Sequence, residues 1–256
     1  MTIVMDHTFE RLKTGIKGLD DLVEGGFPKG RTILVSGATG TGKSIFGMQF
    51  IYKGAVDYGE PGVFVTFDEN PDKMREDLLR FGWDIHEEEK KDKVAIIDGS
   101  SARAGSPSEE EHLLMPGLDF NKLLVDMIGV CKKLGAKRLV VDSIPAIGQL
   151  LEREGDIRRN LLKLSYVLGK TGVTTIITSE IEEQDMKQGP TKFSKYGVEE
   201  YVADGVILLN MLSIGSTENR TAYIRKMRGT KHSLAIHPLQ INEHGLNIKK
   251  AEDIFK

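Results

Sequence analysis

One eight-residue segment constrains the fold of this chain more than any other feature. Residues 37–44 read GATGTGKS and satisfy the pattern G-x-x-x-x-G-K-[S/T] in full. The segment follows an apolar, β-branched run at 31–37 and precedes a stretch of helical period, so it joins a strand to a helix. Its glycines allow consecutive backbone N–H groups to point at one anion, beside the positive end of the helix dipole. The segment therefore predicts an α/β fold with a phosphate-binding loop.

Short apolar runs alternate with amphipathic stretches over the first 180 residues, which predicts βαβ units. Five runs are nearly continuous in apolar character, as is typical of parallel strands covered on both faces: residues 31–37, 62–67, 93–98, 137–142 and 172–178. After residue 200, alternating runs predict antiparallel strands that close one edge of the sheet. We expect a mostly parallel twisted sheet flanked by helices, in a single domain over residues 1–256. Residues 86–93 are predicted to be a solvated linker, and 99–117 a mobile loop.

The phosphate-binding loop also predicts the class of ligand. Lys43 would reach the β- and γ-phosphates of a nucleoside triphosphate, and the Ser44 hydroxyl would bind Mg²⁺. Asp142 ends the run RLVVD, and we expect its carboxylate to support the same Mg²⁺ ion. The remaining residues predicted to surround the phosphates are Gly37, Ala38, Thr39, Gly40, Thr41 and Gly42.

Hydrolysis of a nucleotide requires a group that orients or deprotonates the attacking water. Asp68 and Glu69 follow the strand at 62–67, at the sheet edge where ligands bind in open α/β folds. Both are candidate catalytic carboxylates, and their chemistry alone does not decide between them. Residues 178–180 end another strand at this edge, where they would either sense the γ-phosphate or simply begin a polar loop.

Composition restricts the class of protein further. The chain has 35 basic and 38 acidic side chains, which disfavours a main role in gripping nucleic acid, because such proteins usually carry a basic surplus. Cys131 is the only cysteine, which excludes an internal disulfide and favours a reducing compartment. Neither a membrane-spanning run nor a signal-peptide pattern is evident. We expect a soluble cytoplasmic protein that does not contact a membrane.

Several stretches of the chain resemble signature segments of KaiC-type domains, which belong to the RecA-like P-loop ATPases. They include VFVTFDENPDKM, RLVVDS, SKYGVEEYVADGVILLN and KMRGTKH, and the similarity runs from about Thr14 to near the C-terminus. The resemblance implies a RecA-like P-loop core that binds ATP and Mg²⁺ between the subunits of a homo-oligomer, a hexameric ring. It also implies that Lys226, Arg228 and His232 reach the nucleotide bound by the neighbouring subunit.

Two departures from the family pattern refine this hypothesis. Asp68 stands where the family usually has Glu and where RecA-like enzymes have their water-activating residue, so its shorter side chain leaves the rate of hydrolysis open. Residues 199–201 read EEY where the family's phosphorylating domain has adjacent Ser and Thr, so autokinase activity is not expected.

The resulting hypothesis is slow ATP hydrolysis that drives conformational or regulatory change, with room for an unidentified protein partner. One alternative is a RecA-like DNA-handling ATPase that uses the lysines and aromatics of residues 181–196, although acidic residues in that stretch oppose it. Another alternative is a nucleotide-gated interaction module with little turnover.

Overall fold

The computed structural model describes residues 10–114, 120–149, 154–181, 192–214 and 217–251. The five strands predicted in the first 180 residues run parallel to one another: β3 (Thr32–Gly37), β4 (Gly62–Thr66), β5 (Val94–Asp98), β6 (Arg138–Asp142) and β7 (Thr174–Glu180). Backbone ladders join β3 to β7, β7 to β6, β6 to β4 and β4 to β5. All five confirm the strands predicted from apolar character, although β7 begins and ends two residues later than expected.

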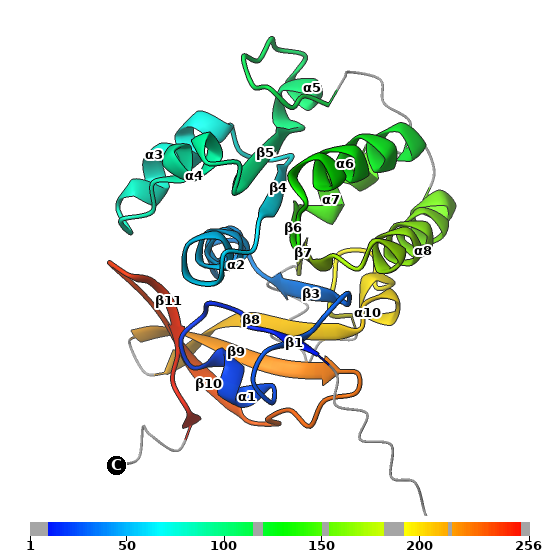
Figure 1. The fold of residues 1–256 in the computed structure, drawn as a ribbon. Helices are drawn as coiled ribbons and strands as arrows, with labels where there is room; N and C mark the ends of the chain where they lie inside the picture. Colours follow the sequence, from blue (N-terminus) through cyan, green and yellow to red (C-terminus); the bar gives the residue numbers. More distant parts are fainter. Residues whose placement is uncertain (1–9, 115–119, 150–153, 182–191, 215–216, 252–256) are drawn as a thin grey trace, which may run out of the picture.

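Four further strands extend the sheet beyond β3: β8 (Gly205–Ile214), β9 (Thr217–Met227), β10 (Ile236–Asn242) and β11 (Gly245–Ile248). β8 runs parallel to β3, and the pairs β8–β9, β9–β10 and β10–β11 are antiparallel. The order across the nine-stranded sheet is β11-β10-β9-β8-β3-β7-β6-β4-β5 (Figure 1). The predicted mostly parallel sheet with an antiparallel C-terminal edge is therefore confirmed.

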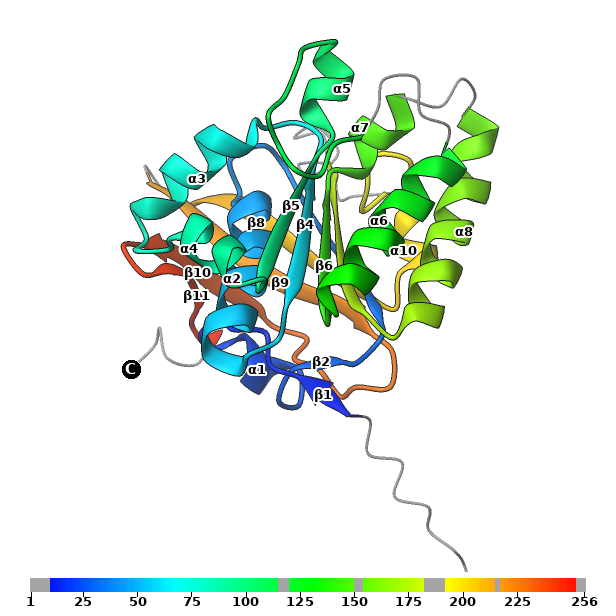
Figure 2. The ribbon, with the colours of Figure 1, turned by 45° about the horizontal axis from the view of Figure 1, so that its top comes forward.

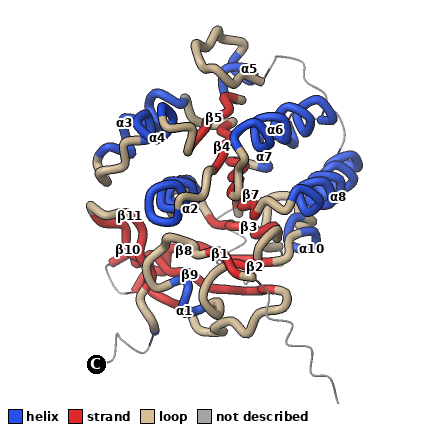
Figure 3. Tube along the Cα trace, viewed as in Figure 1, coloured by secondary structure: helices blue, strands red, loops and turns tan. Residues whose placement is uncertain are grey.

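Helices cover both faces of the parallel part of the sheet (Figures 1 and 2). One face carries α2 (Lys43–Tyr58), α3 (Pro71–Leu79) and α4 (Ile85–Lys90). The opposite face carries α6 (Phe120–Leu134), α7 (Ile144–Gln149), α8 (Glu154–Thr171) and α10 (Glu199–Val202). Figure 3 shows these helices on either side of the strands, with the short pair β1 (Arg11–Leu12) and β2 (Phe27–Pro28) and helix α1 (Leu19–Leu22) beside the antiparallel strands.

The helices form where sequence and burial agree. Asn70 caps α3, because its side chain accepts hydrogen bonds from the backbone N–H groups of Asp72 and Lys73, and Pro71 occupies the first helical turn. Apolar residues at helical spacing form a buried stripe along α8: Ile157, Leu161, Leu164 and Leu168. Among the described residues, no helix is long and apolar enough to cross a membrane.

Two segments differ from the local prediction. Residues 86–93, expected to be a solvated linker, contain most of α4, in which Ile85 and Glu88 are buried. The predicted loop at 99–117 begins with helix α5 (Ser100–Ala104), and its residues 115–117 lie outside the described part of the chain. The first of these segments is a nearly continuous run of charged residues, HEEEKKDK, and a six-residue helix has too few apolar positions to show a helical period.

Candidate nucleotide-binding site

The predicted phosphate-binding loop lies between the carboxyl end of β3 and the first turn of α2. Glycine is required at both ends of this loop. A Cβ on Gly37 would lie 2.2 Å from the carbonyl oxygen of Leu209, and Gly42 has a φ of 102°, in the left-handed region that favours glycine. The chain can therefore turn tightly here and expose its backbone to one cavity, which is what binding of a phosphate chain demands.

Lys43 lies inside the loop that precedes it. Its Nζ donates hydrogen bonds to the carbonyl oxygens of Gly37 and Ala38, at 2.9 and 3.0 Å. Burial lowers the pKa of Lys43, while the nearby carboxylates of Glu180, Asp142 and Asp68 act in the opposite direction. The ammonium group is thus held among oxygen acceptors at the floor of the cavity.

Ser44 and Asp142 come together from α2 and β6, as the sequence predicts for a pair of Mg²⁺ ligands. Asp142 is buried at the end of β6, and burial raises its pKa, whereas hydrogen bonds from Ser44 and Thr178 favour its charged form. A hydroxyl and a carboxylate are the hard oxygen donors that Mg²⁺ prefers, so these residues fit the ion. Thr178 donates a hydrogen bond to Asp142, and of the predicted stretch 178–180 it is Glu180 that lines the cavity.

Asp68 and Glu69 both line the cavity, at the end of β4. The carboxylate of Asp68 is half-exposed, and its Oδ2 accepts a hydrogen bond of 2.7 Å from the Ser143 hydroxyl, next to Asp142. The backbone of Glu69 is fixed by Thr66, whose Oγ1 donates to the Glu69 carbonyl at 2.8 Å. Burial raises the pKa of Glu69, and the neighbouring Asp77 and Asp142 raise it further. The two carboxylates are therefore in different electrostatic environments.

The structure adds cavity residues that the sequence did not single out. Arg220 of β9 donates from Nε to the carbonyl oxygen of Gly40 at 3.1 Å, and Ile241 of β10 lines the same cavity. Both reach the phosphate-binding loop only because the antiparallel strands pair in one register, which no local motif encodes. The full lining is Thr39, Gly40, Gly42, Lys43, Ser44, Ile45, Asp68, Glu69, Asp142, Ser143, Glu180, Arg220 and Ile241.

Lys226, Arg228 and His232 do not line this cavity. Met227 pairs with Gly205, and Gly205 pairs with Ile33 near the start of β3, whereas the phosphate-binding loop follows the other end of β3. Lys226 instead donates from Nζ to the carbonyl oxygens of Glu200 and Ala203, at 3.0 and 2.6 Å. Lys226 and Arg228 are thus at the opposite end of the sheet from this chain's own phosphate-binding loop.

Arg228 and His232 also have partners within their own chain. Arg228 lies 3.5 Å from the Asp204 carboxylate, and the Nδ1 atom of His232 lies 3.0 Å from the carbonyl oxygen of Ser233. Their predicted contact with a neighbouring subunit stays a prediction. The stretch predicted for nucleic-acid binding falls largely outside the described residues, at 182–191.

A family model described as "ATPase: KaiC" matches residues 12–253. The chain belongs to this family. Membership implies nucleotide binding, and the cavity described above supplies a loop, a lysine and an oxygen pair suited to it. The resemblance read from the motifs is thereby confirmed, and so is the RecA-like P-loop core that it implied.

Individual relatives agree with the family assignment. The KaiC-type domain is 38% identical over 239 residues to the circadian clock oscillator protein KaiC of Synechococcus elongatus, covering 93% of this chain and 44% of that protein. It is also 38% identical over 238 residues to a UPF0273 protein of Methanocaldococcus jannaschii, covering 93% of this chain and 95% of that one. The chain therefore spans less than half the length of the clock protein.

A solved structure confirms the fold. The crystal structure of a KaiC-like protein from Pyrococcus horikoshii OT3 superposes on the KaiC-type domain with a TM-score of 0.82 and 43% sequence identity. The match covers 95% of this chain and all of that one.

Proposed function

We propose that this KaiC-type domain binds Mg·ATP in the cavity at the carboxyl ends of β3, β4 and β6 and hydrolyses it slowly. The observation that carries the proposal is the convergence of Lys43, Ser44, Asp142 and Asp68 on one cavity, although they come from three separate segments of the chain. A phosphate-binding loop alone would support binding. The Asp68 carboxylate, beside the Ser44 hydroxyl and the Asp142 carboxylate, adds the group that hydrolysis requires.

Each residue has a role set by its position. Backbone N–H groups of residues 37–44 and the Lys43 ammonium would offset the charge of the β- and γ-phosphates. Ser44 and Asp142 would hold Mg²⁺, which when bound neutralises charge on the transferred phosphoryl group. Arg220 and Ile241 would contact the part of the nucleotide nearest the antiparallel strands.

Asp68 is the carboxylate that we propose for orienting the attacking water. Its contact with Ser143 keeps it beside Asp142, where the terminal phosphate would lie. Glu69 is disfavoured because it also borders a second hollow against α3, whose lining includes Met74, Leu78 and Asp77. Its raised pKa reflects that partly buried position.

Ring assembly would complete the site. In this proposal the chain forms a homo-oligomer, a hexameric ring, and Lys226 and Arg228 of one subunit approach the nucleotide of the next, with His232 beside them. Their distance from the chain's own phosphate-binding loop along β3 supports a role in a neighbouring site. Cations placed there would stabilise phosphoryl charge only in the assembled particle. A cytoplasmic location and an unidentified protein partner complete the proposal.

The proposal is tested by measuring ATP binding and phosphate release on the same samples. We expect Lys43→Ala to lose binding and turnover together, and Asp68→Asn to keep binding while phosphate release falls by roughly 10²-fold or more. Glu69→Gln is the matched carboxylate control and should change turnover less. Tight ATP binding without phosphate release in the unaltered chain would instead favour a nucleotide-gated interaction module.

A further inference from the structure

Helix α5 and the ten residues after it form a closed segment at the rim of the nucleotide cavity. We call residues 105–114 the strap. Asp98, the last residue of β5, caps α5 by accepting hydrogen bonds at Oδ1 from the backbone N–H groups of Ser100 and Ser101, at 2.8 and 3.1 Å. The strap then returns to the same residue, because the Asp98 N–H donates to His112 and the Leu114 N–H donates to Asp98. Both ends of the segment are therefore fixed at one point.

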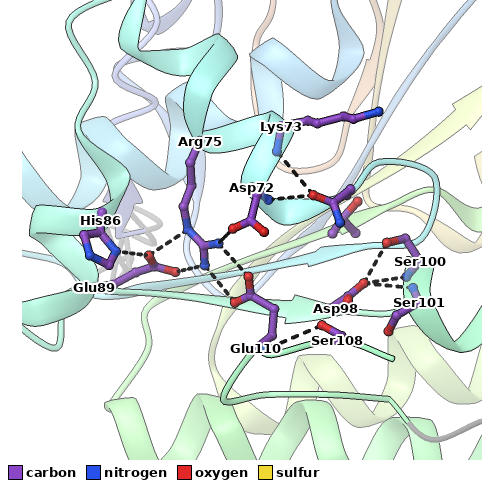
Figure 4. Close-up of polar contacts among 12 residues, drawn as sticks. Asp72, Lys73, Arg75, His86, Glu89, Asp98, Ser100, Ser101, Ser108 and Glu110 are labelled. Atoms are coloured by element: carbon purple, nitrogen blue, oxygen red, sulfur yellow. Dashed lines mark hydrogen bonds and ion pairs between the residues drawn. The ribbon is translucent and has the colours of Figure 1, made fainter. Parts of the chain in front are cut away.

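A single arginine clamps the middle of the strap (Figure 4). Arg75 of α3 uses all five of its N–H donors: two on Glu89 of α4, two on Glu110 of the strap and one on Asp72, at distances from 2.6 to 3.1 Å. The side chains of Arg75, Glu89 and Glu110 are only 17, 19 and 15% exposed, so water competes weakly for these contacts. The strap is thus held against α3 and α4.

The segment presents Arg103 to the proposed water-orienting carboxylate. Arg103, in the last turn of α5, donates from Nη1 to Oδ1 of Asp68 and to the carbonyl oxygen of Phe67, the latter at 3.3 Å. The other carboxylate oxygen, Oδ2, accepts from Ser143 at 2.7 Å. Asp68 is therefore gripped at both oxygens, by donors from α5 and from the end of β6.

We propose that Arg103 is a positioning residue for Asp68, and that α5 and the strap exist in part to hold it there. The inference rests on the proposed hydrolytic function. An Asp side chain is short, and one whose side chain is 50% exposed can rotate between staggered conformers. Two donors on opposite oxygens select one conformer, so the remaining lone pairs point in a fixed direction. Orientation of this kind acts on the rate of the chemical step and leaves nucleotide affinity unchanged.

Steady-state kinetics of phosphate release with the full chain tests the assignment. We expect Arg103→Ala to lower kcat by about tenfold while KM for ATP stays within about twofold. Arg103→Lys should recover part of the loss, because one nitrogen of Arg103 makes both contacts and an ammonium can replace it. The double variant Arg103→Ala, Asp68→Asn should be no slower than Asp68→Asn alone, since both changes act through one carboxylate.

Arg159→Ala is the matched control, because Arg159 forms an exposed ion pair with Asp156 on α8. It should leave kcat unchanged. An unchanged or increased kcat in Arg103→Ala would overturn the inference, as would a rise in KM alone or an additive loss in the double variant. No turnover by the unaltered chain would reject the proposed hydrolysis and this inference together, whereas turnover that Arg103→Ala leaves intact would reject the inference alone.

Discussion

Arg138 shows how much a single buried side chain can organise in this molecule. Its guanidinium is fully buried and donates to the carbonyl oxygens of Phe50 and Lys13, each at 2.8 Å, and from Nε to Glu60 at 2.9 Å. Burial lowers the pKa of Arg138, and the hydrogen bonds to Glu60 oppose that shift. One residue of β6 thereby fixes α2 and the N-terminal segment to the sheet.

Because Arg138 packs against α2, we expect replacement of Gly54 by alanine to destabilise the protein, contrary to the usual effect of this substitution in a helix. Alanine normally stabilises a helix by about 1 kcal/mol relative to glycine. A Cβ on Gly54 of α2, however, would lie 2.2 Å from Nε of Arg138, whose hydrogen bonds prevent it from moving aside. We expect Gly54→Ala to lower the free energy of unfolding by about 2 kcal/mol, measured by urea denaturation.

Gly129→Ala is the control for this prediction. Gly129 lies in α6, and nothing is within 4 Å of the position of its Cβ. We expect this variant to gain about 0.5–1 kcal/mol. If Gly54→Ala and Gly129→Ala changed the free energy of unfolding equally, the Arg138 side chain would be able to move aside without cost.

At the residue scale, the sequence predicted those cavity residues that lie in the phosphate-binding motif or directly at the end of a predicted strand. Lys43 and Ser44 open α2, Asp142 ends β6, and Asp68 closely follows the end of β4. All four lie near the carboxyl edge of the sheet, so their meeting follows from a parallel sheet. Arg220 and Arg103 were not predicted. Their places depend on strand register and on a five-residue helix, and neither leaves a pattern in the sequence.

At the scale of elements, the strap depends on the Arg75 clamp. We expect Glu110→Ala to lower the free energy of unfolding by about 2 kcal/mol, because it removes two charge-assisted hydrogen bonds at a largely buried site. Arg75 would keep its contacts with Glu89 and Asp72. Urea denaturation again supplies the measurement.

Glu109→Ala provides the comparison for the clamp. Glu109 precedes Glu110 and is exposed, so its removal should change stability by less than about 0.5 kcal/mol. If both variants unfolded at the same urea concentration, the clamp would contribute nothing to stability.

Elements with many apolar positions were predicted well, and short polar ones were not. α8 displays its buried stripe over four turns, whereas α5 has no buried side chain and is held by Asp98 and Arg103. Helices of that kind are formed by their capping and tertiary contacts. Such helices cannot be predicted from the sequence alone, because the contacts that form them depend on where the flanking strands lie.

At the scale of the whole molecule, the proposed ring makes a complementation experiment possible. Lys43→Ala and Arg228→Ala should each be inactive as pure samples. In an equal mixture that reassembles at random, about a quarter of the interfaces would join an intact phosphate-binding loop to an intact Arg228. We therefore expect phosphate release to recover to roughly a quarter of the unaltered level.

The mass of the particle, measured with and without Mg·ATP, should accompany this mixture, because recovery requires mixed particles. A mixture that stays inactive although mixed particles form would place Arg228 outside the neighbouring site. Recovery without any assembly would equally contradict the proposed arrangement.

Strand β9 connects the phosphate-binding loop of its own chain to the residues proposed to reach the neighbouring subunit's nucleotide. Arg220 near its start reaches the phosphate-binding loop of its own chain, and the strand ends at Met227, between Lys226 and Arg228. Arg220 and Met227 are separated by about 23 Å of extended backbone, at roughly 3.3 Å per residue. In a ring, such a strand would act as a stiff rod between successive nucleotides. Nucleotide binding at one site would then change the affinity of the next site, and the effect would be reciprocal.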